Sequence, residues 1–171
     1  MQIFLDKILI KKDYNISLVR ILSFLFFFLS LLVGVYRTVS LSLGSIITIF
    51  LIAAFVFIFS YLVEILIFYL VFKKHLSGFK MAEKQIAPLI FVEWFLFLLL
   101  SILQLFIEIP NIRLFNLALN QILPVIYIGY LIHKNTFQSK CYTCGVVYIL
   151  INLLLVLPNI MTNLMSSGFV I

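Results

Sequence analysis

The stretch that decides the fold is Ile46–Phe72, IITIFLIAAFVFIFSYLVEILIFYLVF, in which Glu64 is the only charged residue. A helix over these residues is about 40 Å long, which exceeds the roughly 30 Å hydrocarbon core of a bilayer. Strands of membrane β-barrels alternate apolar and polar residues over about ten positions, and this run does not alternate. The stretch therefore predicts a transmembrane α-helix.

The composition of the whole chain supports the same conclusion. Of 171 residues, 65% are hydrophobic and 11% are charged, and the mean hydropathy is +1.27. Soluble domains carry roughly 45–50% apolar and about 25% charged residues. Such a chain has too little polar surface to cover an exterior that faces water. Because lipid leaves every backbone polar group to be satisfied internally, we expect an all-α, polytopic transmembrane helical bundle.

The pattern of apolar runs predicts five spans in one domain. We expect a single five-span transmembrane domain over residues 21–171, preceded by an amphipathic cytoplasmic segment over residues 1–20. That first segment mixes apolar residues with Lys7, Lys11 and Lys12. It can lie on an anionic leaflet or form a short solvated tail, and the sequence leaves both open. The predicted spans cover residues 21–36, 46–72, 86–107, 114–132 and 145–165.

The distribution of Lys and Arg predicts the orientation. With the N-terminus in the cytoplasm and the C-terminus outside, ten of the 12 basic residues lie inside, and only Arg37 and Arg113 lie outside. We therefore expect a multi-pass integral membrane protein of a bacterial cytoplasmic membrane. Its expected partners are the lipid bilayer, with anionic lipid at the cytoplasmic face, and a membrane protein. The net charge of +6 follows from this topology and needs no nucleic acid partner.

Two carboxylates lie inside the predicted spans. Glu64 is nine residues before Lys73, and Glu93 is nine residues after Lys84, so both sit about 13 Å from the cytoplasmic ends of their helices. The short loop between these spans predicts antiparallel packing and a similar depth for both carboxyl groups. We predict that they share a polar interior and do not face lipid, with at least one of them protonated at neutral pH.

Further polar residues extend this candidate intramembrane site, which comprises Glu64, Glu93, Gln104, Asn120 and Asn152. A polar cavity or proton path is the functional hypothesis, and interhelical hydrogen bonding with close packing of small residues is the structural one. We favour the structural hypothesis for the Asn and Ser residues and leave the two Glu residues open. The last span aligns Tyr148 with Asn152, and the first span offers a face of small residues: Ser23, Ser30 and Gly34.

Cys141 and Cys144 form a C-x-x-C motif at the start of the last span. These four residues resemble the vitamin K epoxide reductase family, whose additional loop cysteines are absent here. Besides a redox role and a pair of thiols without a function, metal binding by the two cysteines with His133 or His75 is a third hypothesis. We predict that the two thiols are reduced in cells and dispensable. No Ser-His-Asp set, phosphate-binding glycine loop or H-E-x-x-H motif occurs, so we expect no catalytic residues, no cofactor and no metal site.

Two local segments resemble the Yip family, the Rab-interacting membrane proteins and their bacterial relatives. The first runs from Phe68 through the basic loop with Gly78, Phe79 and Lys80 to Pro88, and the second is Ile128–Lys134. The family has a double glycine in the basic loop, where this chain has Gly78 alone. The resemblance implies five spans, a cytoplasmic N-terminus and a non-enzymatic role, and it transfers no catalytic residues.

Two classes of function follow. The first is a non-enzymatic integral membrane protein that acts as an organiser, adaptor or accessory factor through helix packing with lipid or a partner. The second is a small transporter or substrate-binding membrane subunit that uses the interior around Glu64 and Glu93.

Overall fold

The computed structural model describes residues 15–36, 43–107, 112–133 and 141–166, and every regular element in these ranges is helical. This confirms the all-α prediction. Three of the described helices, Ile16–Tyr36, Gly44–His75 and Phe79–Phe106, are long and apolar enough to cross a membrane. Gln121–His133 and Tyr142–Leu155 are shorter apolar helices. The chain is therefore a helical membrane protein. Its elements are α2 (Ile16–Tyr36), α3 (Leu43–Phe72), the 3-10 turn η1 (Lys73–His75), α4 (Phe79–Phe106), α5 (Ile112–His133) and α6 (Tyr142–Ser166).

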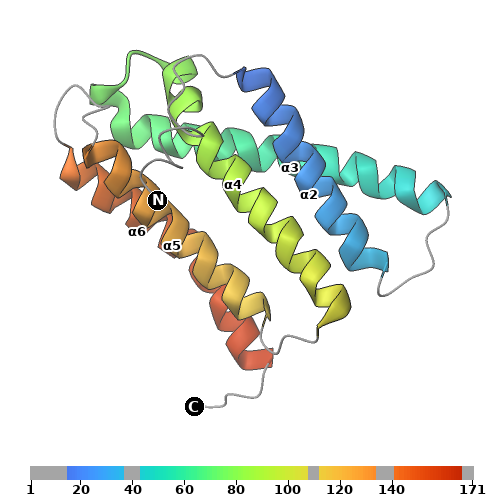
Figure 1. Ribbon diagram of the computed structural model, residues 1–171. Helices are drawn as coiled ribbons and strands as arrows, with labels where there is room; N and C mark the ends of the chain where they lie inside the picture. The colour runs from blue at the N-terminus through green and yellow to red at the C-terminus, as the bar shows by residue number, and fades with distance from the viewer. Residues whose placement is uncertain (1–14, 37–42, 108–111, 134–140, 167–171) are drawn as a thin grey trace.

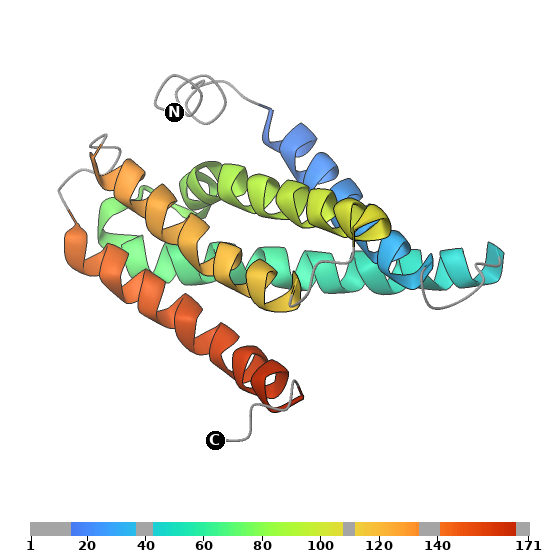
Figure 2. The same ribbon diagram turned by 60° about the horizontal axis from the view of Figure 1, so that its bottom comes forward.

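The helices form a row that one long helix crosses (Figure 1). Helix α4 packs between α2 and α5, and α6 packs against α5. Helix α3 crosses this row obliquely and contacts α2, α4 and α6. In both views the N-terminal end of α3 projects beyond the other helices (Figure 1 and Figure 2). Helix α3 thus supplies a surface against which α2, α4 and α6 all pack.

Helix α2 starts earlier than the apolar pattern predicts. The Asn15 side chain accepts hydrogen bonds from the backbone N–H groups of Ser17 (3.0 Å) and Leu18 (3.4 Å), which is the usual role of an N-cap asparagine. The predicted boundary after residue 20 therefore falls inside a continuous helix. The remainder of the predicted amphipathic segment, residues 1–14, lies outside the described residues.

Helix α4 also starts earlier than predicted. The Gly78 carbonyl accepts hydrogen bonds from the N–H groups of Met81 (3.1 Å) and Ala82 (3.2 Å), so the helix is already formed ahead of residue 86. The charged segment 73–84, predicted as a loop, is a 3-10 turn followed by the first turns of α4. Hydropathy marks only the apolar part of a helix, whereas backbone hydrogen bonding continues into its polar end.

Helices α2 and α4 share a seam of aromatic and small side chains. The rings of Phe27 and Trp94 lie 4.5 Å apart, centroid to centroid. Ser23 and Ser30 are buried, as the predicted small face requires. Their hydroxyls donate to carbonyls of their own helix, at Val19 (2.8 Å) and Phe27 (2.6 Å), so they allow close packing without bonding to a neighbouring helix. Gly34, the third member of that predicted face, is exposed.

Helices α5 and α6 approach closely at Gly145. A Cβ atom added to this glycine would lie 2.8 Å from Ile132 Cδ1 and 3.0 Å from Ile128 Cγ2. Both distances are shorter than ordinary van der Waals contact, so the absent side chain allows the two helices to meet. This contact sets the start of α6 against the end of α5.

Candidate functional site: an intramembrane acid pair

Glu64 on α3 and Glu93 on α4 lie close enough for their charges to interact. Many protein atoms surround both carboxyl groups, although a part of each side chain stays accessible. The two acids therefore lie near each other and do not project into lipid on opposite sides of the bundle. That they share a polar interior at similar depth in the bilayer stays a prediction.

Tyr148 of α6 completes the cluster. Its side chain is fully buried, and its ring packs edge-on against Phe68 of α3 at 5.5 Å between centroids. Both acids act on the Tyr148 hydroxyl electrostatically. Among the described residues, no group makes a hydrogen bond of ordinary geometry to this hydroxyl, and the Asn152 side chain lies near it. A buried polar group without a partner is uncommon in native structures, and it marks a place where a proton, ion or water can bind.

The other three residues of the predicted polar site have different outcomes. Asn152 lies one turn after Tyr148, and its amide donates to the Tyr148 carbonyl at 3.1 Å, so it joins the edge of the cluster. Gln104 is partly buried but lies eleven positions beyond Glu93, about 16 Å along α4, and so belongs to another level of the bundle. The Asn120 side chain is outside the described residues. Helical periodicity predicts which face of a helix a residue lies on, but it does not separate residues at different depths.

A second polar cluster, which the sequence analysis did not identify, lies near the start of α2. Arg20 of α2 forms an ion pair with Glu83 of α4, and the Tyr61 hydroxyl of α3 donates to the same carboxylate at 3.0 Å. The Arg20 guanidinium also lies 5.7 Å from the centre of the Tyr61 ring. The prediction assigned Glu83 to a loop, and this hid the fact that Arg20 and Glu83 occupy the same end of neighbouring helices.

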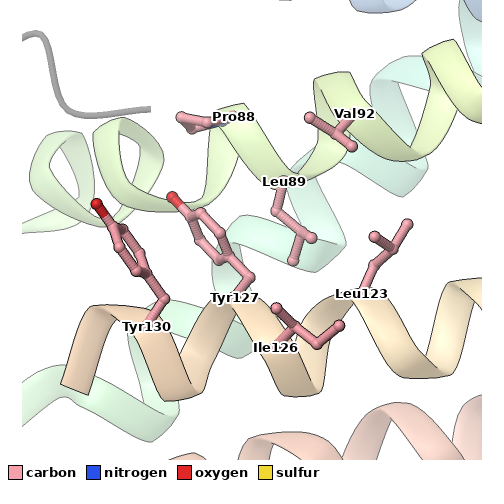
Figure 3. Close-up of a pocket in the computed structure, with 7 residues that line it drawn as sticks. All are labelled: Pro88, Leu89, Val92, Leu123, Ile126, Tyr127 and Tyr130. Atoms are coloured by element: carbon pink, nitrogen blue, oxygen red, sulfur yellow. The ribbon is translucent and has the colours of Figure 1, made fainter. Parts of the chain in front are cut away.

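The described residues also line two cavities. A small one of about 60 Å³ lies between α4 and α5, where Pro88 and Leu89 face Leu123, Tyr127 and other apolar groups (Figure 3). Beside it, the Tyr127 hydroxyl donates to the Gln85 carbonyl and so joins α5 to α4. A larger cavity of about 410 Å³ adjoins Arg20, Tyr61 and Glu83 and has otherwise apolar walls. Neither cavity contains the acid pair.

The two cysteines differ from expectation. The structure joins Cys141 and Cys144 in a disulfide, whereas we expected free thiols. The physical reason is the spacing: one helical turn sets their Cα atoms 5.4 Å apart, inside the range of about 4.4–6.8 Å that a disulfide spans. The redox state of the pair in cells stays a prediction.

No match to this chain was found among protein-family models, curated proteins or solved structures. The resemblance to the Yip family consequently stays a prediction from two local segments. The function has to be argued from the chain's own geometry.

Proposed function

We propose that this protein is a five-span membrane protein with its N-terminus in the cytoplasm, whose acid pair binds a proton or a small cation during transport. The excess of basic residues on one side supports the orientation. Reporter fusions test the topology: those at Ser77 and Ser139 should report the cytoplasm, and those at Ser42 and Ser166 the opposite side. Fusions at Ser139 and Ser166 that report the same side would contradict five spans.

The interaction between Glu64 and Glu93 is the observation that supports a transport function. Ionisable residues within membrane spans are costly, and they commonly mark ion or proton pathways. Two carboxylates in a low-dielectric interior cannot both be charged without a large penalty, whereas a proton or cation held between them relieves the repulsion. The Tyr148 hydroxyl supplies a third oxygen, which is close enough for both acids to act on it electrostatically.

The test is proton flux into proteoliposomes that enclose a pH-sensitive dye, under an imposed membrane potential and in choline, sodium or potassium buffer. The wild-type chain should show flux above that of protein-free vesicles. The Glu64→Gln and Glu93→Gln variants keep shape and hydrogen bonding but cannot titrate, so they should fold and lose the flux. The matched control is Glu83→Gln, which removes a carboxylate outside the acid pair and should retain it.

Wild-type flux at the level of empty vesicles in all three buffers would contradict the proposal. So would undiminished flux in the Glu64→Gln/Glu93→Gln double variant. Size-exclusion chromatography of each variant in detergent separates loss of function from loss of folding.

A role as organiser, adaptor or accessory factor is the second candidate. It is supported by one face of α3, on which Leu51, Phe55 and Phe59 follow one another at four-residue spacing and are all exposed. A partner's transmembrane helix would bind this face. A photo-crosslinking residue at position 55 should then capture a defined protein in native membranes, with position 68, which is buried, as the control. If position 55 crosslinks only to lipid, this face of α3 binds no protein partner, which would contradict the second candidate function.

A further inference from the structure

Three side chains that can bind a metal ion meet where α3 ends and α6 begins. His75 lies in the turn η1, Cys141 immediately precedes α6, and Cys144 lies in its first turn. The two sulfur atoms and a His75 ring nitrogen all lie within 4.8 Å of one another. His75 and Cys141 are 66 positions apart in the sequence, so the fold alone creates this cluster.

We propose that Cys141, Cys144 and His75 form a redox-controlled binding site for a thiophilic cation such as Zn²⁺. The reduced chain binds the ion through two thiolates and one imidazole nitrogen, and the disulfide is the metal-free form. Zinc–sulfur distances of about 2.3 Å and zinc–nitrogen distances of about 2.0 Å put neighbouring ligand atoms of a tetrahedral site roughly 3.3–3.8 Å apart. Small side-chain rotations bring atoms that lie within 4.8 Å of one another to that spacing.

A thiol reductant converts the disulfide into the metal-binding form. Two reductant thiols supply two electrons and two protons to the Cys141–Cys144 disulfide, which becomes two thiols, and the reductant becomes a disulfide. Zn²⁺ then replaces the two thiol protons, which are released, and accepts the neutral nitrogen of His75. A disulfide oxidant reverses the step: it takes two electrons from the two thiolates and two protons from solvent and becomes two thiols. The Cys141–Cys144 disulfide then forms again, two of the three ligands are lost at once, and the Zn²⁺ ion is released.

The burial and position of the site fit this assignment. Cys141 is only 7% exposed, and His75 and Cys144 are partly buried, so protein atoms shield the cluster while leaving a way in. In the proposed orientation this end of the bundle faces the cytoplasm, where thiols are kept reduced. Three protein ligands leave the fourth tetrahedral position for water or another ligand.

The experiment uses the full chain in detergent, reduced or oxidised, titrated with Zn²⁺ against a chromophoric chelator. The reduced wild type should bind one equivalent, and the oxidised wild type none at this site. Replacement of Zn²⁺ by Co²⁺ should give thiolate-to-metal charge-transfer absorption and the visible bands of tetrahedral cobalt. His75→Ala should weaken binding at least about 100-fold, since loss of a ligand exceeds the 10- to 100-fold effect of outer-shell changes.

The chain offers a matched control in its other histidine. His133, exposed at the end of α5, is replaced by Ala in a variant that should bind as the wild type does. Cys141→Ser/Cys144→Ser should abolish the cobalt bands. Absence of stoichiometric binding in reduced protein with two titratable thiols would overturn the proposal, as would equal affinities of His75→Ala and the wild type. These measurements do not involve Glu64 or Glu93, so their failure is distinct from failure of the transport proposal.

Discussion

Two faces of α3 are equally apolar in sequence and opposite in environment. On one face, Ile65, Phe68 and Phe72 are at most 1% exposed, and the rings of Phe68 and Phe72 contact Tyr148 of α6. On the other face, Phe55 is 75% exposed and Phe59 is 66% exposed. In a soluble protein, exposed aromatic residues of this kind would mark an interaction site, but in lipid they need no protein partner. Apolarity therefore predicts that α3 crosses the membrane, but not which of its residues form the core.

Alanine substitution at Phe68 and at Phe55 should give the largest difference between the two faces of α3. Phe68→Ala leaves a cavity among α3, α6 and the buried Tyr148, and it should lower the free energy of unfolding by about 3 kcal/mol. Phe55→Ala removes a ring that faces outward and should cost under about 0.5 kcal/mol. Unfolding of both variants in mixed micelles, followed by circular dichroism, measures the contrast. Equal losses of stability would show that both faces of α3 pack against protein.

Two glycines of the α5–α6 pair extend the comparison to a second interface. Gly145→Ala places a methyl group against Ile128 and Ile132 and should destabilise the bundle by about 1–3 kcal/mol. Gly129→Ala is the matched control, because a Cβ there meets nothing within 4 Å. The same unfolding assay should place the Gly129 variant at or slightly above wild-type stability. A stable Gly145→Ala protein would mean that α5 and α6 separate easily.

Removal of one hydroxyl should have the smallest effect and tests a polar contact between α5 and α4. Tyr127→Phe removes the hydrogen bond from α5 to the Gln85 carbonyl and should cost about 1 kcal/mol. Tyr36→Phe changes a side chain that is 69% exposed and should leave the unfolding midpoint unchanged. If the two variants unfold alike, apolar packing alone holds α5 against α4.

Part of the candidate site could be predicted because the depth of a residue in its span, and the order of the helices, can be counted along the sequence. The spacings of Glu64 from Lys73 and of Glu93 from Lys84 give equal depths, and a short connection makes neighbouring helices antiparallel. Their interaction in the structure follows from these two facts. Gln104 shares a face with Glu93 but lies eleven positions farther along α4, so its place in the same site stays a prediction.

The helix boundaries could not be predicted from hydropathy patterns. The start of α4 at Phe79 depends on backbone hydrogen bonds to the Gly78 carbonyl, which hydropathy does not report. The contact of Arg20 with Glu83 was missed for the same reason, since Glu83 had been assigned to a loop.

The sequence by itself determined that the chain is helical and membrane-embedded. Only lipid can surround a chain with 65% hydrophobic residues, and in lipid the backbone N–H and C=O groups must hydrogen-bond to each other, as they do in a helix. The tertiary structure alone decided which equally apolar faces are buried, that Tyr148 joins the acid pair, and that His75 reaches the cysteines. These are three-dimensional outcomes of how helices rotate and cross. When every face of a helix is apolar, neither hydropathy nor the spacing of residues in the sequence determines how the helix is rotated about its axis. Side-chain shape and close contacts such as the one at Gly145 determine it.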